Sequence, residues 1–142
     1  MVCIDYFSKW AEAFPVPDQT ARTTALLEVV SRFGCPVTLH SDQGRNFESN
    51  IITELCSFLQ IKKTRTTPGN PKCNGLVERF NGTLIQMIRA YIITDDEWDM
   101  YLSCVTAAYR STPQESTGLT PNILVFGREV RFPAEVIFKP ET

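Results

Sequence analysis

The chain has 142 residues, of which 43% are hydrophobic and 21% charged, and this composition is typical of one globular domain with its own core. No apolar run approaches the roughly 18 residues of a membrane span, and the first residues lack the features of a signal peptide, so no membrane association is expected. The formal net charge of −2 disfavours a protein that holds nucleic acid mainly through bulk positive charge.

The cysteines argue against two kinds of site. The chain has five of them, an odd number at wide spacings, with no C-x-x-C pair and a single histidine, which disfavours a disulfide framework and excludes a zinc knuckle within these residues. Cys3, Cys56 and Cys104 lie in apolar patterns. We therefore expect them to be small core residues of a protein in a reducing compartment.

Hydrophobic periodicity and turn residues predict alternating strands and helices. In chain order, the predicted elements are strands at 1–7 and 10–16, a helix at 20–33, a strand at 37–40, a helix at 49–60, a strand at 61–66, and helices at 76–91, 96–110 and 122–126. The stretch 67–75 contains several Pro, Gly and Asn residues and is expected to be a loop.

Capping residues set several of these boundaries. Thr20 is expected to cap the first helix, and Ser49 or Asn50 the second. Gly34 and Gly127 follow the last periodic residue of their helices, where glycine commonly ends a helix.

The order of the elements indicates the fold class. Ser8 and Lys9 separate the first two strands, which suits an antiparallel hairpin. The helix between the strands at 37–40 and 61–66 is a crossover, and such a connection makes two strands parallel. We therefore predict one α/β domain with a mixed sheet over residues 1–130, followed by a C-terminal tail or linker over 131–142.

Two carboxylates stand where an α/β fold often places its chemistry. Asp42 follows the strand at 37–40, and Glu78 lies in the first turn of the long helix. Carboxylates from separate elements can hold a divalent cation for phosphoryl transfer. Each also has an ordinary structural explanation, because aspartate favours turns and glutamate favours the first turn of a helix.

Basic residues surround Glu78 in the sequence. Five cations fall within eighteen positions that hold one acid, Glu78: they are Lys62, Lys63, Arg65, Lys72 and Arg79. A local basic face beside this glutamate is therefore expected in spite of the negative net charge.

The amino-acid sequence around both carboxylates is specific enough to indicate a family. "HSDQGRNFES" and "TTPGNPKCNGLVERFNGTL" resemble the catalytic core of retrotransposon and retroviral integrases, particularly those of the Ty3/gypsy type. Thirty-five residues separate Asp42 from Glu78, as in the D,D-35-E motif of that family. "DYFSKWAEAFPVPDQTA" and "WDMYLSCVTAAYRSTPQESTGLTPNILVFGREVRFP" are also similar to it, so the resemblance covers nearly the whole chain.

The resemblance implies an RNase H-like fold in which three acids hold two Mg²⁺ or Mn²⁺ ions for 3′ processing and strand transfer on DNA. Asp42 would be the second acid and Glu78 the third. It also implies contact with the element ends and target DNA, a homodimer or higher oligomer, and action in the nucleus after a cytoplasmic phase of the parent element. The residues expected beside DNA are Asn46, Pro71, Lys72, Asn74, Gly75 and Arg79.

The first acid of the family motif has no clear counterpart. In the family this aspartate lies in the strand before the one that contains the "DYFSKW" segment. It belongs to a D-F-x-G-P segment, which this sequence does not contain. Asp5 is therefore expected to be a structural acid of the hairpin, and the chain to lack both its first strand and one metal ligand. The sequence leaves open whether this chain is itself an enzyme, and the alternative is a non-catalytic, host-retained module that binds DNA or another protein.

Overall fold

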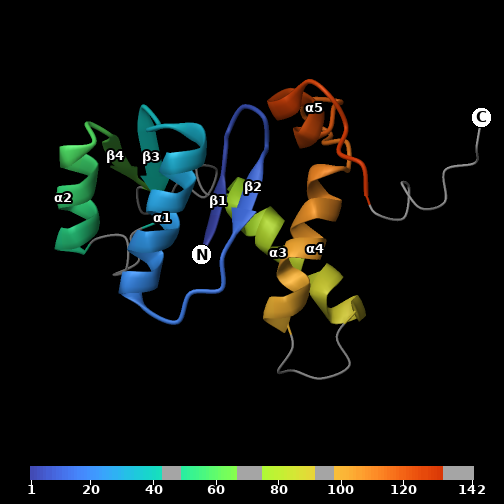
Figure 1. Cartoon of the computed structure of the whole chain (residues 1–142), viewed down its shortest axis with the longest axis horizontal. Coiled ribbons are helices and arrows are strands. Elements are labelled where there is room, and N and C mark those ends of the chain that lie inside the picture. Colours follow the sequence, from blue (N-terminus) through green and yellow to red (C-terminus); the bar gives the residue numbers. More distant parts are fainter. Residues whose placement is uncertain (43–48, 67–74, 92–97, 133–142) are drawn as a thin grey trace, which may run out of the picture.

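A computed structural model describes residues 1–42, 49–66, 75–91 and 98–132 (Figure 1). The elements, in chain order, are β1 (Val2–Ile4), β2 (Ala11–Ala13), α1 (Gln19–Phe33), β3 (Thr38–Ser41), α2 (Asn50–Phe58), β4 (Lys62–Arg65), α3 (Gly75–Tyr91), α4 (Trp98–Arg110) and α5 (Pro121–Phe126). Every predicted element is present, although β1, β2 and β4 are shorter than expected. Most of the expected tail, from residue 133 onward, lies outside the described residues.

The four strands form two separate pairs. β1 and β2 are antiparallel, with Val2 opposite Ala13, and β3 and β4 are parallel, with Thr38 opposite Lys62. Both predicted pairings and the α/β class are therefore confirmed. The single mixed sheet is not formed among the described residues, because β1 and β3 do not pair with each other.

A cavity of about 300 Å³ separates the two pairs. It is bordered by Cys3 and Ile4 of β1, by Thr38 and Leu39 of β3, and by one face of α1 that includes Val29. Each of β1 and β3 pairs along one edge only within the described part of the chain. The cavity therefore lies between two strand edges, and the backbone N–H and C=O groups along each edge could pair with a further strand.

Each pair of strands has its own hydrophobic core. The first core joins the hairpin to α3 and α4, and its buried members are Ala11, Phe80, Leu84, Leu102, Val105 and Tyr109. The second joins α1 and α2 to the start of β4, and its buried members are Leu26, Ile52, Cys56 and Ile61. None of the helices in the described residues is long and apolar enough to cross a membrane.

The capping predictions are mostly confirmed. Ser49 caps α2 by accepting a hydrogen bond from the backbone N–H of Ile52, and Gly127 ends α5 in the left-handed conformation. The cap predicted for α1 was wrong, because Asp18 and not Thr20 accepts from the N–H of Ala21, at 2.8 Å. Asp18 stands outside the helix three residues before that donor, whereas Thr20 already lies inside the helix.

The cysteine prediction holds for one residue and fails for another. Cys56 is buried in the second core, and Cys3 is partly buried beside the cavity between β1 and β3. Cys104 is exposed, so its prediction as a core residue was wrong. The buried face of α4 carries Leu102 and Val105, and Cys104 lies on the opposite face.

The buried carboxylate of Glu12 connects β2 to two helices. Its oxygens accept from the Trp10 indole at 2.9 Å, and they lie 3.0 Å from an Arg110 guanidinium nitrogen and 3.6 Å from one of Arg32. Arg110 also donates from Nε to the backbone carbonyl of Ala11, at 2.8 Å. Because Arg32 belongs to α1 and Arg110 to α4, Glu12 ties both helices to the hairpin.

Replacing Glu12 with glutamine should therefore destabilise the protein strongly. We expect Glu12→Gln to lower the free energy of unfolding by about 3 kcal/mol, because it leaves the part-buried Arg110 without its counter-charge. Glu28→Gln is the matched control, because Glu28 also pairs with Arg32 but both side chains are about half exposed. That change should cost at most about 1 kcal/mol. Equal losses for the two variants in urea unfolding would contradict this account.

Burial also sets the reactivity of Cys3. It raises the pKa of this thiol from 9.0 to about 11, so Cys3 contributes to stability below pH 9 and that contribution is lost as the pH rises through about 11. At pH 9 the thiolate fraction of Cys3 should be roughly fiftyfold lower than that of an unshifted thiol. Iodoacetamide should then modify the exposed Cys104 well before Cys3, as mapped by peptide mass spectrometry. Equal rates at the two positions would contradict the burial of Cys3.

Candidate active site

Asp42 follows directly after β3, at the carboxyl end of the parallel pair. The pairing with β4 fixes this end, because the Thr66 N–H donates to the carbonyl of Ser41 at 3.0 Å. The Ser41 hydroxyl in turn donates to the carbonyl of Asp42, at 3.1 Å. The Asp42 residue is exposed, so its carboxylate is accessible at the edge where open α/β sheets bind ligands.

His40 stabilises the same strand end. Its Nδ1 lies 2.9 Å from the Thr64 hydroxyl, and its Nε2 lies 3.2 Å from the Thr66 hydroxyl. Both ring nitrogens are therefore engaged with side chains of β4 and its following residue. His40 fixes the strand end and does not serve as a metal ligand in this arrangement.

Glu78 lies in the first turn of α3, and the core fixes this helix. Two positions later, Phe80 is buried and packs edge-on against Tyr109 of α4, with ring centroids 4.5 Å apart. Glu78 is exposed, because the face of the helix that carries it is not the face that enters the core. The geometry therefore holds a carboxylate toward solvent on a well-anchored helix.

The two carboxylates fit a divalent cation in chemistry and number of donors. Exposed oxygens on separate elements suit a hard ion such as Mg²⁺, which keeps waters and takes further oxygens from a substrate phosphate. Among the described residues, no group of three or more His, Cys, Asp or Glu side chains could hold a metal ion. Asp42 and Glu78 each offer carboxylate oxygens of the kind that such an ion takes, and a two-ion site would require a further acid.

Asp5 has a structural role in the hairpin turn. Its carboxylate oxygen accepts from the Ser8 backbone N–H at 2.8 Å and from the Ser8 hydroxyl at 2.6 Å. Its backbone N–H also donates to the carbonyl of Trp10. These bonds close the turn, in agreement with the prediction that Asp5 is a structural acid.

Only two of the predicted DNA contacts can be placed. Asn46, Pro71, Lys72 and Asn74 lie outside the described residues. Gly75 begins α3, and a Cβ added there would meet nothing within 4 Å, so the space in front of this backbone is open. Arg79 is exposed one turn later and donates from Nε to the carbonyl of Gly75, at 3.1 Å.

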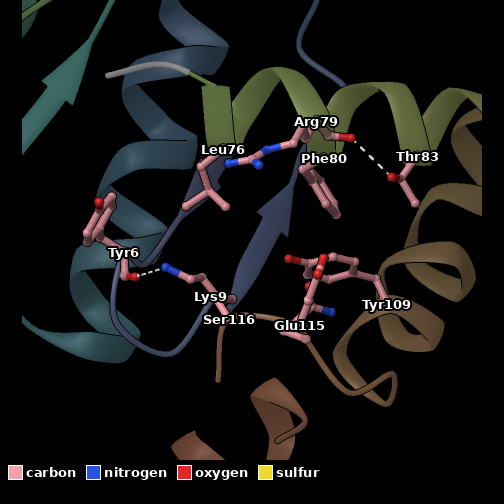
Figure 2. Close-up of a pocket in the computed structure, with 10 residues that line it drawn as sticks. Tyr6, Lys9, Leu76, Arg79, Phe80, Thr83, Tyr109, Glu115 and Ser116 are labelled. Carbon is pink, nitrogen blue, oxygen red and sulfur yellow. Dashed lines mark hydrogen bonds between the residues drawn. The ribbon is translucent and has the colours of Figure 1, made fainter. Parts of the chain in front are cut away.

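The structure adds a pocket that was not predicted. Its volume is about 580 Å³, and it lies between the β1–β2 turn, α3 and the chain after α4 (Figure 2). Its lining includes Tyr6, Lys9, Leu76, Arg79, Phe80 and Tyr109. In Figure 2, Arg79 extends from α3 on one side, and Tyr6 and Lys9 lie on the turn at the other. The adjacent aromatics Tyr6 and Phe7 beside a turn were the signal in the sequence that could have indicated it.

The sequence matches the integrase core family and the Pol polyproteins of retroviruses and a transposon. The model of the integrase core domain family matches residues 1–71. The retrovirus-related Pol polyprotein from transposon 412 of Drosophila melanogaster is 32% identical over 130 residues, which are 89% of this chain and 10% of that protein. The chain thus spans about a tenth of the length of the curated relatives it matches.

Solved structures agree with the sequence match. The catalytic core domain of BIV integrase is 28% identical, with a TM-score of 0.71 over 87% of this chain and 82% of that one. The HTLV-2 integrase catalytic core domain, solved in complex with magnesium, has a TM-score of 0.69 over 84% of this chain and 79% of that one, and at 22% identity it shows the shared fold. The RNase H-like fold class is confirmed, and the chain belongs to the integrase core domain family.

Proposed function

We propose that this chain is the catalytic core of a Ty3/gypsy-type retrotransposon integrase, which joins the ends of the element to target DNA. The observation that carries the proposal is the placement of Asp42 at the end of β3 and Glu78 in the first turn of α3, in a chain of the integrase core family. Both carboxylates are exposed on anchored elements and are separated by the family's 35 residues.

In this proposal Asp42 and Glu78 supply oxygen ligands to Mg²⁺ or Mn²⁺. The ion, when bound, activates the attacking oxygen and stabilises the leaving one. Magnesium is bound by the HTLV-2 core, which shares the fold. For this chain the assignment depends on the oxygen chemistry and exposure of its own two carboxylates.

We also propose that an upstream strand of the parent polyprotein occupies the cavity between β1 and β3 and carries the first acid. Two strand edges border this cavity, together with the apolar face of α1, and a strand placed there could pair with both edges. It would convert the two separate pairs into one continuous mixed sheet. The third carboxylate would then complete a two-ion site.

The remaining roles follow from the family. Asn46, Pro71, Lys72, Asn74, Gly75 and Arg79 would contact DNA, and the protein would act as a homodimer or higher oligomer in the nucleus, after a cytoplasmic phase of the parent element. The open space at Gly75 and the exposure of Arg79 support the contacts at these two positions. Sedimentation of the parent integrase on DNA as a monomer would contradict the oligomer.

Removing either ligand should abolish catalysis without unfolding the protein. In an integrase that contains this core and its upstream segment, Asp42→Asn and Glu78→Gln should each lower strand transfer by about a hundredfold or more, because metal stabilisation of the transition state contributes several kcal/mol. Strand transfer is measured with oligonucleotides that represent the element ends. Glu54→Gln is the matched control, because Glu54 is an exposed glutamate on α2.

Two outcomes would overturn the proposal. Strand transfer that survives both substitutions would exclude the two carboxylates as ligands. DNA binding that is independent of magnesium, without any strand transfer by the unsubstituted integrase, would favour the non-catalytic module instead.

The upstream strand has its own test. Backbone amides along the open edges of β1 and β3 should exchange with deuterium at least about tenfold more slowly in the extended chain than in this one, because a new strand would pair with them. Amides of α4 serve as the control and should change little. Unchanged exchange at both β1 and β3 would show that the cavity does not accept the strand.

A further inference from the structure

The β1–β2 turn presents two aromatic side chains on a rigid support. Tyr6 and Phe7 are 81% and 79% exposed, which is unusual for adjacent large hydrophobic residues. The turn that carries them is closed by the two hydrogen bonds from Ser8 to Asp5, and Lys9 has a positive φ of 61°. These rings can therefore bind a partner at little cost in conformational entropy.

Only one of the two rings borders the pocket. Tyr6 lines the 580 Å³ pocket, whereas Phe7 is not among the residues around it. Phe80 and Tyr109 also line the pocket, and both are buried in the first core. The pocket thus has a fixed apolar wall on α3 and α4 and an exposed ring at its entrance.

Cationic side chains approach this entrance from two elements. The Lys9 ammonium lies 4.4 Å from the centroid of the Tyr6 ring and donates to the Tyr6 carbonyl. Arg79, on α3, is exposed on the opposite side, as Figure 2 shows. Glu115 is the acid among the residues that line the pocket, so cations outnumber anions there.

An exposed ring with one cation beside it and another across the pocket suits a ligand that has both a flat aromatic group and phosphates. Successive bases of a single strand bind to proteins by stacking on aromatic side chains, while basic groups follow the backbone. A base inside a duplex cannot stack on Tyr6, because both of its faces are already covered. The chemistry of the pocket therefore favours an unpaired nucleotide over a base pair.

We propose that this pocket binds one unpaired nucleotide of a DNA strand, with its base against Tyr6 and its phosphates beside Lys9 and Arg79. The inference rests on the proposed function for the identity of the ligand as DNA, and it adds a single-stranded segment to the substrate. Arg79 directly follows Glu78 on α3, so a strand in the pocket and a phosphate at Glu78 can belong to one DNA molecule. An aromatic or acidic peptide is the competing occupant.

The test measures binding to a fluorescent duplex with a short single-stranded extension, compared with the same duplex with a blunt end. EDTA is present, so the result does not depend on metal or catalysis. The unsubstituted chain should bind the extended duplex more tightly, and Tyr6→Ala should weaken that binding by about fivefold or more. Phe7→Ala is the matched control, because Phe7 is as exposed as Tyr6 and does not line the pocket, and it should change binding by less than about twofold.

Two further variants separate stacking from charge and from folding. Tyr6→Phe keeps the ring and should retain the affinity. Lys9→Gln should make the slope of log affinity against log salt concentration shallower, by the amount expected for the loss of about one phosphate contact. The proposal is overturned if the unsubstituted chain does not prefer the extension, as expected for a peptide pocket, or if Tyr6→Ala and Phe7→Ala lose affinity equally. Glu54→Gln, an exposed change on α2 outside the pocket, should bind like the unsubstituted chain. Because the assay contains EDTA, a failure of the proposed catalytic role would not be confused with a failure of the pocket.

Discussion

The carboxylate of Glu12 is the interaction on which the arrangement of the helices depends. It is nearly buried on β2 and lies between Arg32 at the end of α1 and Arg110 at the end of α4. Burial lowers the pKa of the Arg110 guanidinium, and the nearby Glu12 carboxylate opposes that shift. Arg110 also lies over the Trp10 ring, 4.2 Å from its centroid, and Trp10 contacts rings of α1 and α5. Charge and aromatic packing therefore join the hairpin to three helices at one place.

This constraint positions the candidate site. The hairpin, α3 and α4 share the first core, and that core presents Glu78 and Arg79 toward solvent. Asp42 belongs to the β3–β4 pair, which has a separate core. α1 is the physical link between the two parts, because Leu26 enters the second core while Arg32 and Phe33 reach Glu12 and Trp10. A metal ion held by Asp42 and Glu78 would thus join two units that pack separately, and an added strand between β1 and β3 would strengthen the same connection.

Local patterns predicted the elements well, and contacts between distant residues were missed. The apolar repeat of α3 and the serine cap of α2 are local signals, so both were found. The α1 cap is Asp18 and not the predicted Thr20, because residue preference does not reveal where the first helical N–H points. The division of the sheet and the bond from Arg110 to Ala11, 99 positions away, depend on tertiary packing, which no local pattern encodes. Asp42 and Glu78 were predicted from the surrounding sequence and their spacing, whereas Tyr6, Lys9 and Arg79 come to line one pocket only in the folded chain.

We propose that Asp42 and Glu78 together hold a divalent ion at the junction of these two units. The most direct measurement is a titration of Mn²⁺ followed by electron paramagnetic resonance, in which free and bound ion are distinguished. If both residues serve one site, Asp42→Asn and Glu78→Gln should each weaken Mn²⁺ binding, and the double variant should be little worse than either one. Unchanged Mn²⁺ binding in either single variant, or independent and additive losses in the double variant, would contradict it.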